Sequence, residues 1–195
     1  MEMLREAQSI AQAMAHMLQR PEHGLLVLLL VLAAWSDLQT RRIPNALVFG
    51  GTLLGMVAQL CVPGTAGGLS ALGGMAACLA LMLPMYVLRA MGAGDVKLMV
   101  MVGAFLGLPL AASAALAVFL AGGVLALVYA LCKGAIGKSL TNMADVVQGA
   151  ALSLATGERP SLAIDAAKSA GRVPYALAIA VGTVGFLMLH QFHLV

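Results

Sequence analysis

Long apolar runs separated by short polar stretches dominate the sequence. No Asp, Glu, Lys or Arg occurs in residues 43–88 or in residues 98–132. A helix that crosses a bilayer needs about 20 apolar residues, so each run is long enough for more than one crossing. Turn-forming residues divide the runs at Pro63-Gly-Thr-Ala-Gly-Gly68 and at Gly107-Leu-Pro109. The pattern therefore predicts several membrane helices joined by short turns.

Six helices account for this pattern and give the expected fold class, an all-α polytopic membrane protein. We treat residues 1–195 as a single membrane-embedded domain with six transmembrane helices and short amphipathic interfacial helices. The predicted spans are residues 23–39, 45–62, 69–88, 94–108, 111–132 and 173–190.

Two segments outside the spans have helical patterns of their own. Residues 1–22 place apolar side chains largely on one helical face, as in a helix that lies on the membrane or packs on the bundle. Residues 133–172 form the one long polar connection, in which the periodicity of residues 140–154 predicts an interfacial helix on the cytoplasmic side. Neither segment is expected to form a separate domain.

The first span has one alternative, a cleaved signal peptide, because residues 25–34 resemble the apolar core of such peptides. The region before this core would be longer than 20 residues and would contain three glutamates, which is unusual for a signal peptide. We therefore expect a true membrane span that stays in the protein.

The composition supports a membrane protein and therefore affects how the net positive charge is interpreted. Hydrophobic residues make up 62% of the chain and charged residues 10%, against about 25% charged in an ordinary soluble domain. A net charge of +3 would suggest a nucleic-acid partner for a soluble protein. In a membrane protein basic residues fix the orientation instead, so we expect contact with the lipid bilayer and no nucleic-acid partner.

Basic residues collect on one side of the six-span arrangement. Nine of the eleven Lys and Arg residues lie in connections on the same side as Arg41 and Lys97, and only Arg5 and Arg20 lie opposite. Because basic loops tend to stay in the cytoplasm, this side is predicted to be cytoplasmic and both chain ends to lie outside.

Cysteine and histidine spacing predicts no metal site and no cofactor. Cys61, Cys78 and Cys132 are widely separated within apolar segments and form no CxxC pair, so we interpret them as small buried hydrophobes. His190 and His193 have a spacing suited to a shared metal ion, but for this pair we favour an interfacial tail.

Two acids, Asp37 and Asp95, lie at the edges of apolar segments that are too short to cross a membrane unless the acids are included. Thirteen uncharged residues, 24–36, precede Asp37. They span about 20 Å against a membrane core of about 30 Å. After Asp95 and Lys97 the next apolar segment, 98–108, has only eleven residues. The first span runs inward and the fourth runs outward, so both acids are predicted at the cytoplasmic edge.

The depth of these acids is energetically costly. A charge at the centre of a membrane helix costs on the order of 2–3 kcal/mol, so such an acid usually marks a functional site. The alternative is that each acid pairs with its own neighbour, Asp37 with Arg41 and Asp95 with Lys97. Lys97 follows Asp95 by two residues and points to a different helical face, which makes it a poor partner. The matched depth of the two acids favours a joint function.

Two carboxylates within hydrogen-bonding distance share one proton and titrate as a pair. Such a pair supplies a base that activates water and an acid that stabilises the oxyanion of an attacked peptide carbonyl, and which acid is the base stays open. Gly92 and Gly94 have no Cβ, so the backbone there can unwind, adopt positive φ and let a substrate chain approach closely. The alternative for both glycines is a simple helix start or close helix packing.

Three stretches carry a family resemblance: Asp37 followed by LQTRRIPN, GAGDVKL at 92–98 and RVPYALAIAVG at 172–182. Together they resemble the bacterial type IV prepilin leader peptidases, which are GxGD aspartic proteases, and most nearly the compact branch associated with tight-adherence (Tad/Flp) pili. The resemblance covers roughly residues 25–190. It implies a multi-pass endopeptidase of the bacterial inner (cytoplasmic) membrane, which removes the leader from prepilins and pseudopilins at the cytoplasmic face.

The resemblance also implies roles for individual residues. Carried over by position, Asp37 and Asp95 are the catalytic pair, Gly92 and Gly94 shape the site, and Lys97 lies beside it. The same motifs contain further residues that are expected to shape or support the site: Arg41, Arg42, Pro44, Asn45, Pro174 and Tyr175.

The chain departs from the family pattern in two ways. Ala176-Leu177 follows Pro174-Tyr175 where relatives often have Gly-Pro, so a helix-start proline and an interfacial tyrosine stay open for that pair. Larger relatives carry a cytoplasmic domain with paired CxxC motifs and N-methylate the new amino terminus. The sequence contains neither this domain nor the motif, so no N-methyltransferase activity is expected.

Two other functions stay open from the residues alone. A proton-coupled transporter would place its acids near the bilayer midplane and often has inverted repeats with broken helices. A non-catalytic membrane assembly subunit of a pilus or secretion system would keep its function when Asp37 and Asp95 are changed to Asn. The predicted edge position of the acids favours the peptidase, whereas the cleavage sequence of the substrate and the oligomeric state stay open.

Overall fold

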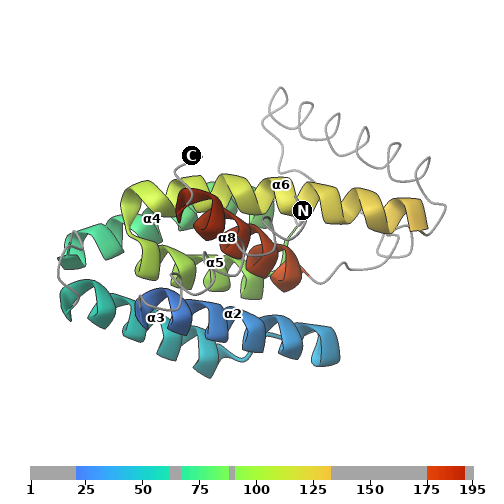
Figure 1. Cartoon of the computed structure of the whole chain (residues 1–195). Helices are drawn as coiled ribbons and strands as arrows, with labels where there is room; N and C mark the ends of the chain where they lie inside the picture. The colour runs from blue at the N-terminus through green and yellow to red at the C-terminus, as the bar shows by residue number, and fades with distance from the viewer. Residues whose placement is uncertain (1–20, 62–66, 88–90, 133–174, 192–195) are drawn as a thin grey trace, which may run out of the picture. The chain divides into compact units, whose positions relative to one another are not determined.

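A computed structural model of the chain describes residues 21–61, 67–87, 91–132 and 175–191. Every element in these ranges is an α-helix, in agreement with the all-α fold class (Figure 1). Each helix begins and ends within a few residues of a predicted span. The helices are α2 (Pro21–Thr40), α3 (Asn45–Cys61), α4 (Gly67–Val87), α5 (Ala93–Leu106), α6 (Leu108–Cys132) and α8 (Tyr175–Gln191).

The chain divides into two compact units, residues 1–122 with 174–195, and residues 123–173. The second unit is described only at residues 123–132, the continuation of α6, and the fold and site below belong to the first unit. The predictions for the N-terminal amphipathic segment, for the interfacial helix of the long connection and for Pro174 lie outside the described residues.

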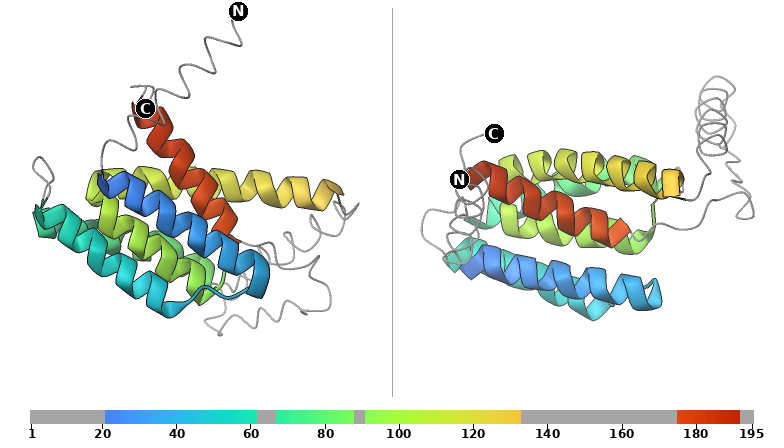
Figure 2. Two further views of the ribbon diagram at one scale, coloured as in Figure 1. Left: turned by 60° about the horizontal axis from the view of Figure 1, so that its bottom comes forward. Right: turned by 45° about the vertical axis from the view of Figure 1, so that its right-hand side comes forward.

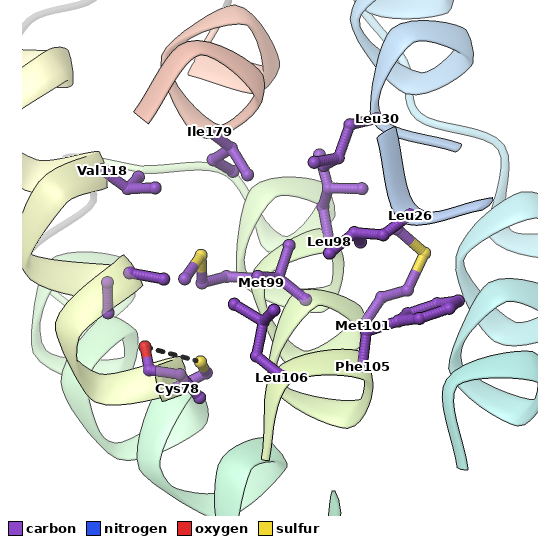
Figure 3. Packing of buried hydrophobic residues seen from close by; sticks show 14 of the residues in the cluster. Leu26, Leu30, Cys78, Leu98, Met99, Met101, Phe105, Leu106, Val118 and Ile179 are labelled. Carbon is purple, nitrogen blue, oxygen red and sulfur yellow. Dashed lines mark hydrogen bonds between the residues drawn. The ribbon is translucent and has the colours of Figure 1, made fainter. Parts of the chain in front are cut away.

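Helix α5 lies at the centre of the first unit. Helices α2, α3, α4 and α8 all pack against it. Figure 3 shows Leu98, Met99 and Met101 of α5 pointing in different directions, with Leu26 of α2 and Ile179 of α8 among the buried residues around them. The nearly uninterrupted apolar sequence after the first turn of α5 explains this position, because a helix without a polar face is buried on all sides.

Glycines let the backbones of neighbouring helices approach α5 closely. A Cβ at Gly74 of α4 would collide with the backbone at Gly103, and a Cβ at Gly103 would collide with the backbone at Gly74. On α3, Gly51 leaves room for the side chain of Met101. Small residues at helix interfaces are typical of membrane proteins, in which close van der Waals packing drives helix association.

The connection between α5 and α6 contains the predicted turn but shifts its boundary. Gly107 has a φ of 74°, a left-handed value that favours glycine. Gln59 of α3 donates a hydrogen bond to the Phe105 carbonyl at 2.7 Å and so satisfies one free acceptor at the end of α5. Helix α6 begins at Leu108, earlier than predicted, because Pro109 fits a first helical turn, where no N–H donor is needed.

The described helices have an unusually apolar surface. Exposed large side chains occur along α2, α3, α4 and α6, among them Leu32, Trp35, Phe49, Leu53, Leu69 and Leu120. Soluble proteins rarely expose large apolar patches, so this surface indicates contact with lipid. Three helices, at residues 21–40, 67–87 and 108–129, are long and apolar enough to cross a membrane, whereas α3 and α8 are apolar but shorter. The structure thus indicates a membrane protein, and the count of six crossings stays a prediction.

Candidate active site

The end of α2 is tied to the loop that follows it. Arg41 adopts a left-handed φ of 52° and ends the helix, while its N–H donates to the Asp37 carbonyl at 2.9 Å. Two hydroxyls hold this turn: Ser36 Oγ donates to the Arg42 carbonyl at 2.9 Å, and Thr40 Oγ1 donates to the Ser36 carbonyl at 2.9 Å. These bonds fix the backbone around Asp37 and so give its side chain a defined place at the helix end.

The start of α5 positions the second acid. Gly92 is the N-cap residue, and its N–H donates to Asp95 Oδ2 at 3.2 Å. A Cβ at Gly92 would lie 3.2 Å from the same oxygen, which is closer than most real Cβ contacts. The absence of a side chain at Gly92 therefore makes room for the carboxyl group of Asp95.

The prediction of positive φ at Gly92 and Gly94 is wrong. Gly92 has an extended backbone, with φ −78° and ψ 153°, and among the described glycines only Gly67 and Gly107 have positive φ. The physical reason is that an extended N-cap residue starts the helix and directs its N–H toward the third residue of the helix, here Asp95. No unwinding of the backbone is needed for this arrangement.

Gly94 lies in the first turn of α5 and faces the loop between α2 and α3. A Cβ at Gly94 would lie 3.5 Å from Ile43 Cδ1, an ordinary van der Waals distance. Ile43 belongs to the same motif as Asp37, and Gly94 belongs to the same motif as Asp95. The structure thus brings the two acidic motifs side by side.

Asp37 and Asp95 lie at the same end of the first unit. Figures 1 and 2 show the end of α2 beside the start of α8, at the end of the bundle where α5 also begins. Both carboxyl groups are half-buried and lie close enough for their charges to interact. Helix α2 runs toward this end and α5 runs away from it, so residues far apart in the sequence become neighbours.

Lys97 is engaged with α3 rather than with the neighbouring acid. Its Nζ donates a hydrogen bond to Asn45 Oδ1 at 3.3 Å and lies 5.5 Å from the centre of the Phe49 ring. Such a cation–π contact at an exposed site contributes about 0.5–1 kcal/mol. Lys97 therefore connects the start of α5 to the start of α3. These contacts agree with the expectation that Lys97 is a poor partner for Asp95.

Tyr175, the first residue of α8, joins the acids at this end. Its side chain is half-buried and lies close enough to Asp95 for the two groups to interact electrostatically. Its hydroxyl rests against α6 at Gly122, where a Cβ would lie 2.7 Å from the hydroxyl oxygen. The structure thus places Tyr175 at the end of the unit that carries the two acids, with its hydroxyl against α6.

The remaining predicted residues lie in the loop between α2 and α3 and at the start of α3. Arg41, Arg42, Pro44 and Asn45 are all exposed. The Pro44 carbonyl accepts a hydrogen bond from the Val48 N–H at 3.3 Å and so begins α3. The loop thus adds exposed positive charge to the end of the unit that carries the two acids.

Sequence reasoning missed several residues of this region. Ser36 and Thr40 had a local signal, because hydroxyl residues near a helix end commonly bond to nearby backbone carbonyls. Ile43, Phe49 and Gly122 had no local signal, because their partners belong to helices that are distant in the sequence.

The arrangement offers acid–base chemistry. Two half-buried carboxyl groups at one end of the bundle can supply a base and an acid in one place. Within the part of the chain that the structure describes, no three His, Cys, Asp or Glu side chains are grouped to hold a metal ion.

Comparison with known proteins adds a family match. A protein-family model, described as the type IV leader peptidase family, matches residues 24–131, more than half of the chain. The match includes Asp37, Asp95 and the glycines beside Asp95, and it ends before α8. No match is found among curated proteins or among solved structures.

Proposed function

The chain belongs to the type IV leader peptidase family, and from that premise we propose that it is an aspartic endopeptidase with Asp37 and Asp95 as its catalytic pair. One observation carries the proposal. Two acids, Asp37 near the end of α2 and Asp95 in the first turn of α5, lie at the same end of the first unit, where Gly94 packs against Ile43, and both lie within the matched residues. Paired acids of this kind supply a base and an acid in one place.

Peptide hydrolysis by this pair needs one proton shared between the two carboxyl groups. The ionised carboxylate removes a proton from a water molecule, whose oxygen attacks the carbonyl carbon of the scissile peptide bond. The protonated carboxyl group donates a hydrogen bond to the oxyanion that develops. When the tetrahedral intermediate collapses, the C–N bond breaks and the leaving nitrogen takes up a proton from the pair.

Neighbouring backbone and side-chain groups prepare the pair for this chemistry. The Gly92 N–H orients the carboxyl group of Asp95 through the bond to Oδ2, and the hydroxyls of Ser36 and Thr40 hold the end of α2. Catalytic groups whose positions are fixed before the reaction lose less free energy to reorganisation during it. The local hydrogen bonds therefore support a prepared site.

We place the site at the cytoplasmic face of the bacterial inner membrane, in a bundle with six crossings. The exposed Arg41, Arg42 and Lys97 at this end support that orientation, because basic residues collect on the cytoplasmic side. Helix α5 has 14 residues. At 1.5 Å per residue it spans about 21 Å. A crossing by α5 therefore draws its first turn, with Asp95, to the membrane edge.

The proposed substrates are prepilins and pseudopilins of the tight-adherence (Flp) type. The apolar helix of such a substrate lies in the bilayer against the bundle, while the bond at the end of its leader reaches the acids at the edge. N-methylation is left out of the proposal, because the three cysteines stand on three different helices and form no CxxC pair.

The catalytic pair is tested by coexpressing the protein with an Flp-type prepilin and following removal of the leader on a gel. Asp37→Asn and Asp95→Asn are each expected to abolish cleavage, because an amide can neither accept the proton from water nor share one with its partner. Immunoblotting of membranes checks that both variants accumulate like the wild type.

Glu22→Gln is the matched control. Glu22 lies on the same helix as Asp37, is buried, and sits in the first turn, at the opposite end from the site. This variant is expected to cleave at the wild-type rate. Normal cleavage by Asp37→Asn or by Asp95→Asn would show that the acids act in assembly or structure rather than in catalysis.

A further inference from the structure

Tyr175 is the third polar side chain near the two acids, and the hydrolysis by Asp37 and Asp95 does not use it. It is the first residue of α8, and the start of this helix lies beside the end of α2 in both views of Figure 2. Ala176, the next residue, and Ile179, one turn further along α8, are both buried in the core. The tyrosine is thus held at the site by the docking of its own helix.

The Tyr175 hydroxyl group packs against a glycine, Gly122, on the neighbouring helix α6. A Cβ at Gly122 of α6 would lie 2.7 Å from the Tyr175 oxygen, 3.0 Å from Cζ and 3.1 Å from Cε2. Real Cβ atoms essentially never show the first distance, and the other two are tighter than most real Cβ contacts, so a side chain at position 122 would force the ring to move. The fit between Tyr175 and Gly122 determines where the hydroxyl lies.

The hydroxyl is a neutral donor in the neighbourhood of a carboxyl group. Tyr175 begins α8, which packs against both helices that carry the acids, α2 and α5. An ordinary tyrosine hydroxyl stays protonated until roughly pH 10, so it can donate a hydrogen bond at every pH at which the pair works. An extended peptide chain offers unpaired backbone carbonyls as acceptors. An ionised carboxylate has no hydrogen to donate to a carbonyl, whereas a tyrosine hydroxyl has one.

We propose that the Tyr175 hydroxyl, seated against Gly122, binds the backbone of the substrate by donating a hydrogen bond to a peptide carbonyl next to the scissile bond. This inference rests on the proposed catalytic pair and adds a substrate-binding residue on a third helix. The scissile segment is then held between the acids of α2 and α5 on one side and the start of α8 on the other. Such a hydrogen bond stabilises the bound substrate and the transition state to a similar extent.

Tyr175→Phe tests the hydroxyl alone, because the ring and its seat against Gly122 are kept. One neutral hydrogen bond corresponds to a roughly three- to tenfold fall in kcat/KM. Since the bond is present before and during the reaction, the change is expected mainly in KM, with little change in kcat. The assay uses purified protein in detergent and a purified prepilin, together with the melting temperature of each variant.

Gly122→Ala tests the seat of the hydroxyl from the other helix. The new methyl group displaces the tyrosine, so KM is expected to rise as in Tyr175→Phe. The KM of the double variant is expected to be no higher than that of the more impaired single variant. Both changes remove the same hydrogen bond, and the effects of coupled changes are not additive. Gly185→Ala on α8 is the control with an unchanged KM, since a Cβ there meets no atom within 4 Å.

Wild-type KM and kcat in Tyr175→Phe would overturn the inference even if both Asp→Asn variants are inactive. A fall in activity that is matched by a fall in melting temperature would overturn it as well, because it would mark a structural role only. Cleavage by an Asp→Asn variant would instead overturn the catalytic pair, so the two failures are distinguishable.

Discussion

At the scale of single residues, glycines decide where the polar groups of the site lie. Gly92 leaves space for the Asp95 carboxyl group, and Gly122 leaves space for the Tyr175 hydroxyl. In both cases the glycine has a neighbour whose polar atom occupies the position next to the missing Cβ. Neither role depends on positive φ at Gly92, since that residue has an ordinary extended backbone.

Gly92→Ala is expected to lower kcat about tenfold, equivalent to about 1.4 kcal/mol in activation free energy. Alanine adopts the backbone conformation of Gly92 without strain. The new Cβ, 3.2 Å from Oδ2, instead forces the Asp95 carboxyl group to shift by a few tenths of an ångström. Leader cleavage by purified protein measures the effect, and the melting temperature should stay close to that of the wild type.

Gly50→Ala serves as the control for this change, because a Cβ at Gly50 of α3 meets no atom within 4 Å. It should cleave normally. A Gly92→Ala variant with an unchanged kcat would show that the orientation of Asp95 tolerates the extra methyl group, and that the missing side chain at Gly92 is not what positions the acid.

At the scale of elements, α5 is both the core of the unit and the carrier of the site. Asp95 lies in its first turn and Lys97 two residues later, and most of the helix beyond them is buried among its neighbours. The backbones of α4 and α5 meet at Gly74 and Gly103, so this contact sets the depth and rotation of α5. The placement of Asp95 therefore depends on packing more than one helical turn away from it.

Gly103→Ala is expected to destabilise the protein by about 1–3 kcal/mol, the usual cost of overpacking a closely packed interior. The added Cβ collides with the backbone of α4 at Gly74, which cannot rotate away as a side chain does. Thermal unfolding in detergent measures the change. Gly185→Ala, with open space around its Cβ, should unfold at or slightly above the wild-type temperature, because alanine is the better helix former.

An unchanged melting temperature in Gly103→Ala would mean that α4 and α5 can separate without cost. The close backbone contact would then not be what positions α5, and a different contact would have to hold Asp95 in place.

At the scale of the whole molecule, apolar helix sides are combined with polar groups at the site end of the first unit. Large exposed apolar side chains along the helices suit lipid, whereas Arg41, Arg42 and Lys97 suit a cytoplasmic edge. The proposed six crossings place the starts of α3, α5 and α8 in the cytoplasm. They place the end of α3 on the outer face.

The natural cysteines test this topology. Cys61, at the end of α3, is exposed and should react with a membrane-impermeant maleimide added to intact spheroplasts. Cys132, at the end of α6, is also exposed and should react only in inside-out vesicles, because six crossings place it on the cytoplasmic side. Buried Cys78 should not react before denaturation. Variants with a single remaining cysteine assign each signal. The prediction that all three cysteines are buried is wrong for Cys61 and Cys132, because each is the last residue of its helix and is exposed there.

Labelling of Cys61 and Cys132 from the same side would rule out the six-span topology. It would require that an odd number of the connecting helices stay out of the membrane, and the shared cytoplasmic position of the acids would then need another explanation.

Much of the fold and part of the site were predictable from the sequence. The six helices follow from apolar runs and turn residues, and each observed helix lies close to its predicted range. The family match followed from motifs that are contiguous in the chain. The end at which Asp37 and Asp95 lie followed from counting residues along helices, because helical rise is a property of the chain alone.

The contacts within that end were decided only by the tertiary structure. Lys97 bonds to Asn45, Gly94 faces Ile43, and Tyr175 rests against Gly122; in each pair the partners belong to different elements. Hydrophobic periodicity indicates which residues form a helix and how deep they lie, but it carries no information about which neighbour a given face will meet. The rotation and spacing of the helices, set by close backbone contacts such as that between α4 and α5, determine those neighbours.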